Sequence, residues 1–121
     1  MYIIRGKVRH GKDRGKKLGY PTANINFHED IPHGIYISQT LTGSTLFNSV
    51  TFVGNATTFN EKKAFVETHI FNFDANLYNK WIEIRLLKKI RKNMRFENAE
   101  SLVREIRKDI KTAKKYFKQN V

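Results

Sequence analysis

The sequence predicts a mainly β protein, a closed or nearly closed antiparallel barrel of five or six short strands followed by one C-terminal α-helix. Runs rich in Ile, Val, Phe and Thr, separated by turn residues, fill the chain up to about residue 90. Apolar residues then recur at helical spacing after residue 98. With 121 residues and 40% hydrophobic side chains, the chain can fill one core. We therefore expect a single domain over residues 1–121, with the barrel at about 1–97 and the helix at about 98–118.

The first strand is predicted over residues 2–9, where side chains alternate between two faces. Residues 10–24 break this alternation with three glycines, Pro21 and a series of charged side chains, so we expect a loop with tight backbone turns. Four further strands are predicted at residues 34–41, 46–54, 64–71 and 80–90. The Thr-Gly-Ser sequence at residues 42–44 predicts the hairpin turn between the first two of these.

The C-terminal helix is predicted from one apolar stripe with spacings of four, four, three and four residues: Leu102, Ile106, Ile110, Ala113 and Phe117. Asn98 is a suitable N-cap, Glu100 lies in the positive first turn, and lysines gather near the negative end. Each large apolar side chain contributes about 1.5–3 kcal/mol on burial, which is enough to dock the helix as a lid on the sheet. The outer face of the helix, rich in Lys and Arg, is a candidate contact for nucleic acid.

Positive charge is concentrated at the two ends of the chain. The sequence carries 23 Lys and Arg against 11 Asp and Glu, a formal net charge of +12. Residues 1–19 contribute +6, residues 20–79 contribute −3, and residues 80–121 contribute +9. This distribution favours a surface that attracts the phosphates of a nucleotide or a nucleic acid, and solvated lysine faces on a soluble basic protein are an equal alternative.

Composition excludes several classes of protein. The absence of Cys removes disulfide scaffolds, thiol nucleophiles, iron–sulfur clusters and Cys-ligated zinc. The four histidines lack the spacing of a metal site. No apolar run approaches the ~20 residues of a membrane span, and the first residues do not resemble a signal peptide. We expect a soluble, cytoplasmic monomer without a membrane partner.

The glycine-rich loop is a candidate phosphate site. Residues 6–13 approach the P-loop pattern, but Asp13 stands where a Ser or Thr must reach magnesium, so a P-loop is excluded. Two interpretations remain open for the loop. Its glycine N–H groups and cations form a different phosphate cradle, or it is a plain exposed loop.

Residues 11–24, Gly-Lys-Asp-Arg-Gly-Lys-Lys-Leu-Gly-Tyr-Pro-Thr-Ala-Asn, resemble the nucleotide-binding signature of the bacterial and eukaryotic riboflavin kinases. Further similar segments follow in the family's order: Pro32–Tyr36, Val53–Phe59, Val66–Ile70, Asn76–Tyr78, Ile90–Arg91, Phe96 and the terminal helix. The resemblance implies a six-stranded antiparallel Greek-key barrel with a C-terminal α-helix. It also implies an enzyme that makes FMN and ADP from riboflavin and ATP, with Mg²⁺ as cofactor.

The resemblance also implies roles for individual residues. Thr22 and Asn24 match the Pro-Thr-Ala-Asn motif that holds magnesium and the nucleotide phosphates, and hydroxyl and amide oxygens suit Mg²⁺. Without the resemblance, both would pass for ordinary turn residues. The other residues expected around the nucleotide phosphates are Gly11, Arg14, Gly15, Lys17, Gly19 and Pro21.

Glu67 matches the catalytic glutamate of the family. The resemblance implies that its carboxylate accepts the proton of the ribityl 5′-hydroxyl, whereas the sequence alone favours a solvated strand glutamate. Phe65, Glu67 and His69 are predicted to share one face of a strand. Tyr78 and Arg91 are expected on the flavin side, and a structural ion pair is an equal alternative for Arg91.

Two residues depart from the family's pattern: Thr57 stands where Pro is usual, and Asn79 stands where Gly is usual. Asn tolerates positive φ, so we expect a glycine-like turn at Asn79 to survive. The sequence starts directly at the first barrel strand, without the FAD synthetase domain of common bacterial homologues, so FMN and not FAD is the expected product. A natural stand-alone kinase and an excised domain both remain open.

A second function from a different class is a flavin-binding, RNA-binding regulator built on the same barrel. The net charge of +12 and the basic C-terminal third motivate this alternative. Thr22, Asn24 and Glu67 favour the enzyme, because a binding protein has little need of a proton acceptor. Nucleic acid is therefore a secondary expected partner, after riboflavin and ATP.

Overall fold

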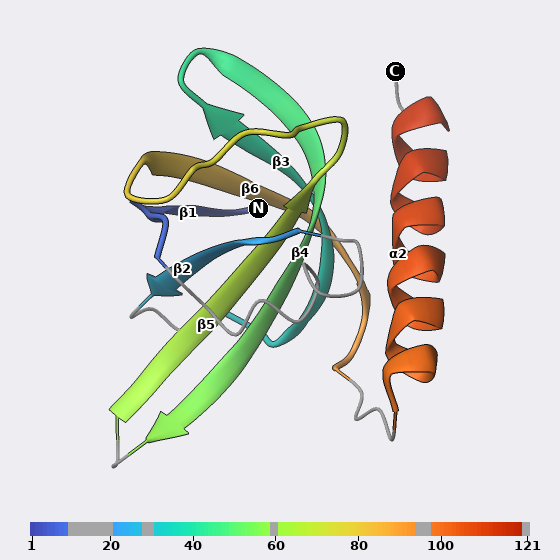
Figure 1. Cartoon of the computed structure of the whole chain (residues 1–121). Coiled ribbons are helices and arrows are strands. Elements are labelled where there is room, and N and C mark those ends of the chain that lie inside the picture. Colours follow the sequence, from blue (N-terminus) through green and yellow to red (C-terminus); the bar gives the residue numbers. More distant parts are fainter. Residues whose placement is uncertain (10–20, 28–30, 59–60, 94–97, 120–121) are drawn as a thin grey trace.

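A computed structural model describes residues 1–9, 21–27, 31–58, 61–93 and 98–119. The elements of this described part are β1 (Tyr2–Lys7), β2 (Ala23–Phe27), β3 (Gly34–Thr42), β4 (Thr45–Thr58), β5 (Glu61–Ile70), β6 (Trp81–Arg91) and α2 (Ala99–Gln119). The strands form one antiparallel sheet in the order β1-β6-β3-β4-β5-β2. Figure 1 shows the sheet curled into a nearly closed barrel, with α2 against one side.

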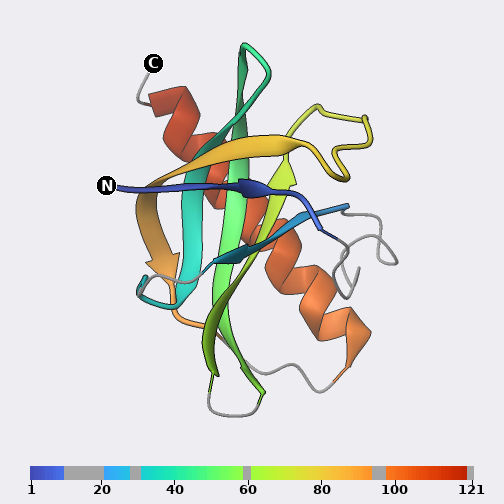
Figure 2. The same ribbon diagram turned by 90° about the vertical axis from the view of Figure 1, so that its left-hand side faces the viewer.

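The strand order confirms the Greek-key topology. Strands β3, β4 and β5 pair with their neighbours in sequence, and β6 returns to pair with β3. The first two strands occupy the two edges of the sheet, because β1 pairs with β6 and β2 pairs with β5. Figure 2 shows these two edge strands crossing the front of the barrel close to each other.

The barrel closes where the end of β1 meets β2. The backbone N–H of Arg9 donates to the carbonyl oxygen of Asn24 at 2.8 Å, and the two residues form an isolated antiparallel bridge. A Cβ atom at Gly6 would collide with Cγ2 of Ile25, so glycine allows β1 to approach β2 this closely. The closure therefore ties the first strand to the segment that follows the glycine-rich loop.

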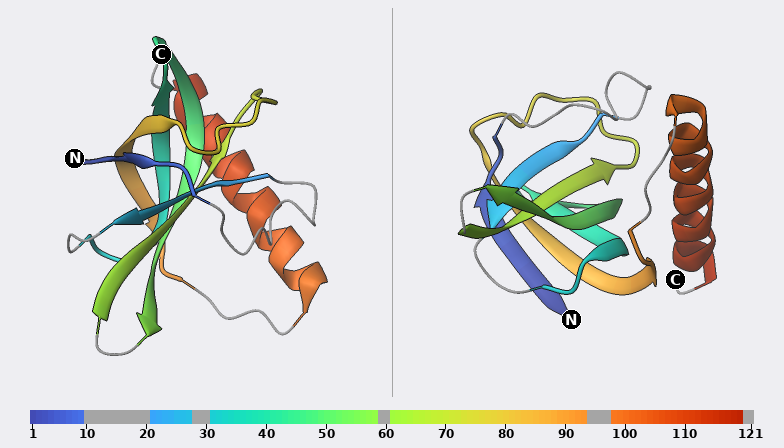
Figure 3. Two further views of the ribbon diagram at one scale, coloured as in Figure 1. Left: turned by 60° about the vertical axis from the view of Figure 1, so that its left-hand side comes forward. Right: turned by 90° about the horizontal axis from the view of Figure 1, so that it is seen from below.

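Two apolar clusters hold the described part of the fold together. Side chains inside the barrel form the first, and its fully buried members include Ile4, Ile25, Val53, Val66 and Ile84. The second lies between the barrel and α2 and consists of Ile37, Phe71 and Ala113, with Val50, Ile90, Ile110, Tyr116 and Phe117 packed around them. The apolar side of α2 thus faces the barrel, and Figure 3 shows from two directions that the helix lies along the barrel.

A chain of five buried hydroxyl groups crosses β3, β4 and β5 inside the barrel. Thr68 bonds Thr51 at 2.8 Å, Thr51 bonds Ser38 at 2.7 Å, Ser38 bonds Ser49 at 2.7 Å, and Ser49 bonds Thr40 at 2.9 Å. All five residues are 0% exposed. Because each hydroxyl has a partner, the chain avoids the cost of unpaired polar groups and fixes the register of three strands.

The predicted elements agree with the observed ones except near the N-terminus. The hairpin turn falls at Gly43 and Ser44 as predicted, and Asn98 caps α2, because its Oδ1 accepts the N–H of Ser101 at 2.8 Å. The predicted loop over 10–24 is wrong at its end, since β2 already begins at Ala23. Within the described residues, no helix has the length and apolarity needed to cross a membrane.

Candidate functional site

Strand pairing brings together the residues that the sequence singled out for chemistry. Asn24 on β2 lies directly opposite Glu67 on β5. Residues opposite each other in an antiparallel pair point to the same face, with Cα atoms about 4.5–5.5 Å apart. Thr22 lies two residues before Asn24, just ahead of the strand. The structure therefore gathers Thr22, Asn24 and Glu67 at one place on the barrel.

Thr22 and Asn24 each carry a buried oxygen that the described residues leave without a hydrogen-bond partner, Oγ1 of Thr22 and Oδ1 of Asn24. Asn24 is only 4% exposed. Leaving a buried polar atom unpaired costs about 1–3 kcal/mol, so both oxygens need a partner that the described residues do not supply. A hydroxyl and an amide oxygen are hard ligands of the kind that Mg²⁺ prefers. The two oxygens suit a magnesium ion whose other ligands are phosphate and water oxygens.

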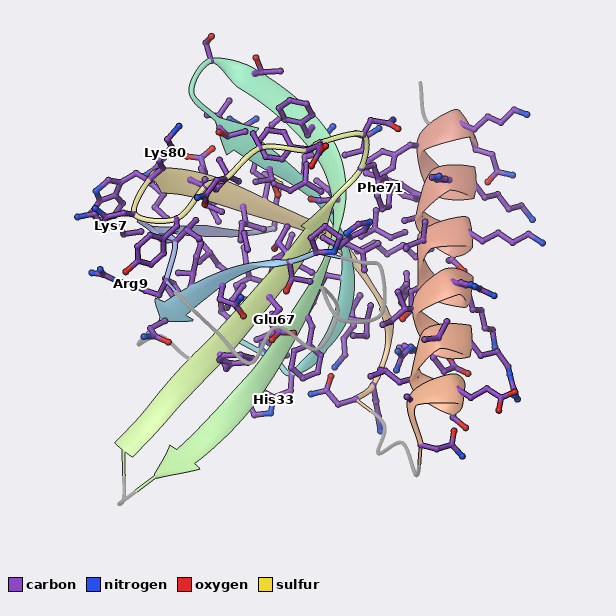
Figure 4. The ribbon with its side chains drawn as sticks, viewed as in Figure 1. Lys7, Arg9, His33, Glu67, Phe71 and Lys80 are labelled. Atoms are coloured by element: carbon purple, nitrogen blue, oxygen red, sulfur yellow. The ribbon has the colours of Figure 1, made fainter. Side chains whose placement is uncertain are left out.

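Glu67 lies on the outer face of the barrel, in the middle of β5. Its neighbours Val66 and Thr68 are 0% exposed and point inward, whereas Glu67 is half-buried, which confirms the predicted alternation. Across the sheet Glu67 also lies opposite Phe52 on β4. Figure 4 shows Glu67 where β2, β4 and β5 run together, on the barrel and away from α2. The residues opposite Glu67 on its two neighbouring strands are therefore Phe52 and Asn24.

His69 connects the carboxylate strand to the turn that carries Thr22. It lies two residues after Glu67, on the same strand face, and its Nδ1 donates to the carbonyl oxygen of Pro21 at 2.9 Å. Since the ring of Pro21 fixes its own φ, this bond holds the backbone immediately before Thr22. The sequence predicted that His69 shares a strand face with Glu67, and it assigned His69 no role in the site. Its spacing of two from Glu67 is the signal that marks it as a neighbour of the site.

Cations gather on the β1 side of Asn24. Arg9 bridges Asn24 through its backbone, and the N–H of Val8 donates to the carbonyl oxygen of Lys80 at 2.9 Å. Figure 4 shows Lys7, Arg9 and Lys80 together at the barrel edge that lies far from α2. Their positive charge favours the approach of phosphate groups to this edge.

Tyr78 lies on a tight turn that contacts the end of β1. The N–H of Lys80 donates to the carbonyl oxygen of Leu77, and the N–H of Asn79 donates to that of Val8, each at 2.9 Å. Asn79 has a φ of 68°, which confirms that this Asn adopts the glycine-like conformation. The side chain of Tyr78 is 45% exposed beside this turn. Its predicted contact with flavin stays a prediction.

Arg91 anchors α2 to the end of β6. Its Nε donates to Oδ1 of Asp109 at 2.8 Å, and its Nη2 donates to Oδ2 at 2.7 Å. The hydrogen bonds that Arg91 donates to Asp109 raise the pKa of Arg91, and Glu105 adds a longer contact at 3.8 Å. The structural ion pair, which was the alternative for this residue, is thus present, and a contact with flavin stays a prediction. Asp109 was not predicted, although an acid next to Ile110 on the buried side of a helix is a usable signal.

Part of the predicted nucleotide site lies outside the described residues. This part consists of Gly11, Arg14, Gly15, Lys17 and Gly19. Pro21 is described, and it contributes its carbonyl oxygen to His69. The side chain of Thr57, the other departure from the family's pattern, also lies outside the described residues. The roles of all these residues except Pro21 rest on the sequence alone.

Comparison with known proteins assigns the chain to a family. Residues 1–117 match the family described as Flavokinase: Riboflavin kinase. The chain is 42% identical over 125 residues to the bifunctional riboflavin kinase/FMN adenylyltransferase of Buchnera aphidicola subsp. Schizaphis graminum, which covers 96% of this chain and 39% of that protein. It is 34% identical over 119 residues to the RNA-binding riboflavin kinase RibR of Bacillus subtilis, covering 97% of this chain and 52% of the relative.

A solved structure supports the fold. The crystal structure of riboflavin kinase from Trypanosoma brucei superposes with a TM-score of 0.67 at 22% identity, covering 96% of this chain and 79% of that one. At this identity the likeness concerns the barrel and its helix. The chain spans about two fifths of the length of the bifunctional relative, 39%.

Proposed function

The chain belongs to the riboflavin kinase family, and we propose that it transfers the γ-phosphoryl group of ATP to the 5′-hydroxyl of riboflavin, producing FMN and ADP. The observation that supports this most directly is the register that sets Asn24 opposite Glu67. A metal-binding amide and a proton acceptor then belong to adjacent strands. Phosphoryl transfer needs these two functions side by side, one for the phosphate charge and one for the attacking hydroxyl.

At the nucleotide end, Thr22 and Asn24 would hold the magnesium ion and the phosphates through the buried oxygens that the described residues leave without a partner. When bound there, Mg²⁺ supplies positive charge that offsets the charge on the transferring phosphoryl group. Two backbone contacts keep this pair in place, because His69 holds the carbonyl of Pro21 and Arg9 holds that of Asn24. Such preorganisation spares the enzyme the cost of ordering these groups during the reaction.

At the acceptor end, Glu67 takes the proton of the ribityl 5′-hydroxyl. The hydroxyl oxygen forms a bond to the γ-phosphorus, the bond from that phosphorus to the β-phosphate oxygen breaks, and ADP leaves. A positioned general base accelerates such a reaction by a factor of about 10²–10⁴. The remaining acceleration comes from alignment of the two substrates and from offset of the phosphate charge.

At the flavin end, the exposed ring of Tyr78 offers a contact for the isoalloxazine, and Arg91 is proposed to shape the flavin site through its bond to α2. We further propose that the protein acts as a cytoplasmic monomer. Size-exclusion chromatography coupled to light scattering checks the monomer, whose mass is 14.2 kDa.

The purified protein, incubated with riboflavin and MgATP, tests the proposal by chromatography of the product. We expect FMN to form in proportion to enzyme and to disappear when magnesium is removed. Asn24→Ala removes one of the two magnesium-binding oxygens and is expected to raise KM for MgATP strongly. Asn26→Ala makes the same change at an exposed position two residues along β2 and serves as the matched control. Riboflavin left unchanged, or equal effects of the two variants, would overturn the proposal.

A regulator that binds flavin and RNA is the second candidate. The printed name of the Bacillus subtilis relative combines RNA binding with riboflavin kinase. The regulator requires flavin binding without turnover, so FMN production by the purified protein separates the two candidates. If the protein binds riboflavin tightly and makes no FMN, the regulator replaces the kinase.

A further inference from the structure

The side of α2 that faces away from the barrel carries a straight row of cations. We name it the α2 cation stripe and define it as Arg104, Lys108, Lys111, Lys115 and Lys118, all of which are exposed. Their spacings of four, three, four and three residues keep them within about 80° of the helix circumference and spread them over about 21 Å of its length. The buried residues of α2, Asp109 and Ala113, lie on the opposite side of the helix, and Figures 1 and 3 show the barrel on one side of α2.

Within the described part of the chain, most of the charge of this stripe has no acidic partner. Glu105 and Asp109, two acids of α2, turn to the barrel and contact Arg91. Glu100 lies on the stripe side and contacts the first member of the stripe, Arg104, at 3.6 Å. Among the described residues, none of the four lysines of the stripe forms an ion pair.

The stripe also costs stability. Like charges three or four positions apart on a helix repel each other by about 0.2–0.5 kcal/mol per pair. Each member of the stripe has such a neighbour, so the free protein carries four unfavourable pairs along one face. A polyanion laid along this face would remove the repulsion and supply the missing partners.

The chemistry of the stripe selects the kind of polyanion. Proteins that bind single-stranded nucleic acid combine a basic groove with aromatic side chains on which the bases stack, and the stripe contains no aromatic residue. Insertion into a membrane needs an apolar helix face, and that face of α2 is packed against the barrel by Ala113 and Phe117. Lysine ammonium groups contact phosphates as point charges without reading bases. A duplex presents one phosphate charge per ~1.7 Å, or about 12 along the stripe.

We propose that the α2 cation stripe binds the phosphate backbone of double-stranded nucleic acid without sequence preference. The interaction surface and the substrate site lie on different parts of the molecule. The stripe faces away from the barrel, whereas Glu67 lies on the barrel. Both can therefore be occupied together. The proposal does not depend on riboflavin phosphorylation.

Fluorescence anisotropy of the full chain with labelled 20-base-pair RNA and DNA duplexes between 50 and 200 mM salt tests the stripe. Five phosphate contacts predict a slope of about −4.5 for log K against log salt with B-DNA. Lys111→Gln with Lys115→Gln is expected to make this slope shallower by about 1.8 and to weaken binding at 50 mM salt by more than about tenfold. Lys88→Gln with Lys92→Gln removes the same charge from exposed positions at β6 and is the matched control.

The proposal predicts that only the stripe variant changes the slope, that both variants keep wild-type circular dichroism, and that FMN formation is unchanged in both. Equal losses in the two double variants would overturn it, because net charge alone would then explain the binding. No measurable duplex binding at 50 mM salt would also overturn it. Binding of the stripe to vesicles of 30% phosphatidylserine in phosphatidylcholine, with no binding to duplexes, would replace the nucleic acid by a lipid surface.

Discussion

The substitution Asp109→Ala tests whether Arg91 serves to anchor α2. Asp109 is 5% exposed and accepts two hydrogen bonds from the Arg91 guanidinium, at 2.8 and 2.7 Å. Truncation to Ala removes both and leaves a guanidinium that is partly enclosed. Glu105 remains within 3.8 Å of Nε and supplies a weaker substitute. Among the described residues, this is the one bidentate ion pair between α2 and the barrel, and the substitution removes it.

The expected cost lies between two limits. Breaking a fully buried ion pair from one side costs about 3–5 kcal/mol, and breaking an exposed pair costs about 0–1 kcal/mol. The side chain of Arg91 is 20% exposed and that of Asp109 is 7% exposed. With Glu105 still present, we expect a loss of about 2 kcal/mol of the free energy of unfolding. For a domain of this length, that loss corresponds to a decrease in Tm of roughly 6–10 °C.

Urea unfolding of the wild type, Asp109→Ala, Arg91→Ala and the double variant measures the coupling between the two side chains. We expect a coupling energy of about 2 kcal/mol. Glu100→Ala is the matched control, because the pair of Glu100 and Arg104 is 85% and 73% exposed, and a change below about 0.5 kcal/mol is expected there. A coupling energy below about 0.5 kcal/mol would refute the anchoring role. If Arg91→Ala raises KM for riboflavin and Asp109→Ala does not, Arg91 contacts the flavin itself.

Substitutions at three further positions test the interior, the turn at Asn79 and the outer face of the barrel. Thr51→Val keeps the shape of the side chain but removes its bonds to two other hydroxyls, and urea unfolding is expected to show a loss of about 1–3 kcal/mol. Because Asn79 has a φ of 68°, Asn79→Ala is expected to lower the free energy of unfolding by about 1–2 kcal/mol, whereas Asn79→Gly should leave it unchanged. Equal losses in the two variants would contradict the turn geometry. Hydrogen bonds from Arg85 and then Arg5 lower the pKa of Glu83 below 4.5. The charged form of Glu83 therefore contributes stability above the pKa of the unfolded chain, and this stability is lost as the pH falls through the lowered pKa of the folded protein. Glu83→Gln should therefore make the free energy of unfolding depend less on pH between pH 6 and pH 3.

Most of the barrel was predictable because its strands carry a clear local signal. Strands β3 to β6 contain runs of β-branched and aromatic residues, and their predicted ranges agree with the observed ones to within about four residues. Strand β2 was missed because it has five residues, two of which are Asn, a residue that is depleted in strands. The alternation of Ile25 and Phe27 with the two Asn residues was the available signal.

The candidate site was predictable residue by residue but not as an arrangement. Sequence motifs identified Asn24 and Glu67, which are 43 positions apart, and only the register of β2 against β5 makes them neighbours. The contact of His69 with Pro21 spans 48 positions and leaves no trace in the local pattern. The resemblance implied either a flavin-side role or an ion pair for Arg91, and it did not show that Asp109 is the acid that pairs with it. Pairing over such distances is set by packing, which a local pattern does not encode.

The most direct test of the account is the turnover number for FMN formation by Glu67→Gln compared with the wild type. The substitution keeps the size of the side chain and removes its ability to accept a proton. We predict that kcat falls about 10²–10⁴-fold, while binding of MgATP, measured by calorimetry on the same preparation, is retained. A kcat within about threefold of the wild type would contradict the assignment of Glu67 as the proton acceptor.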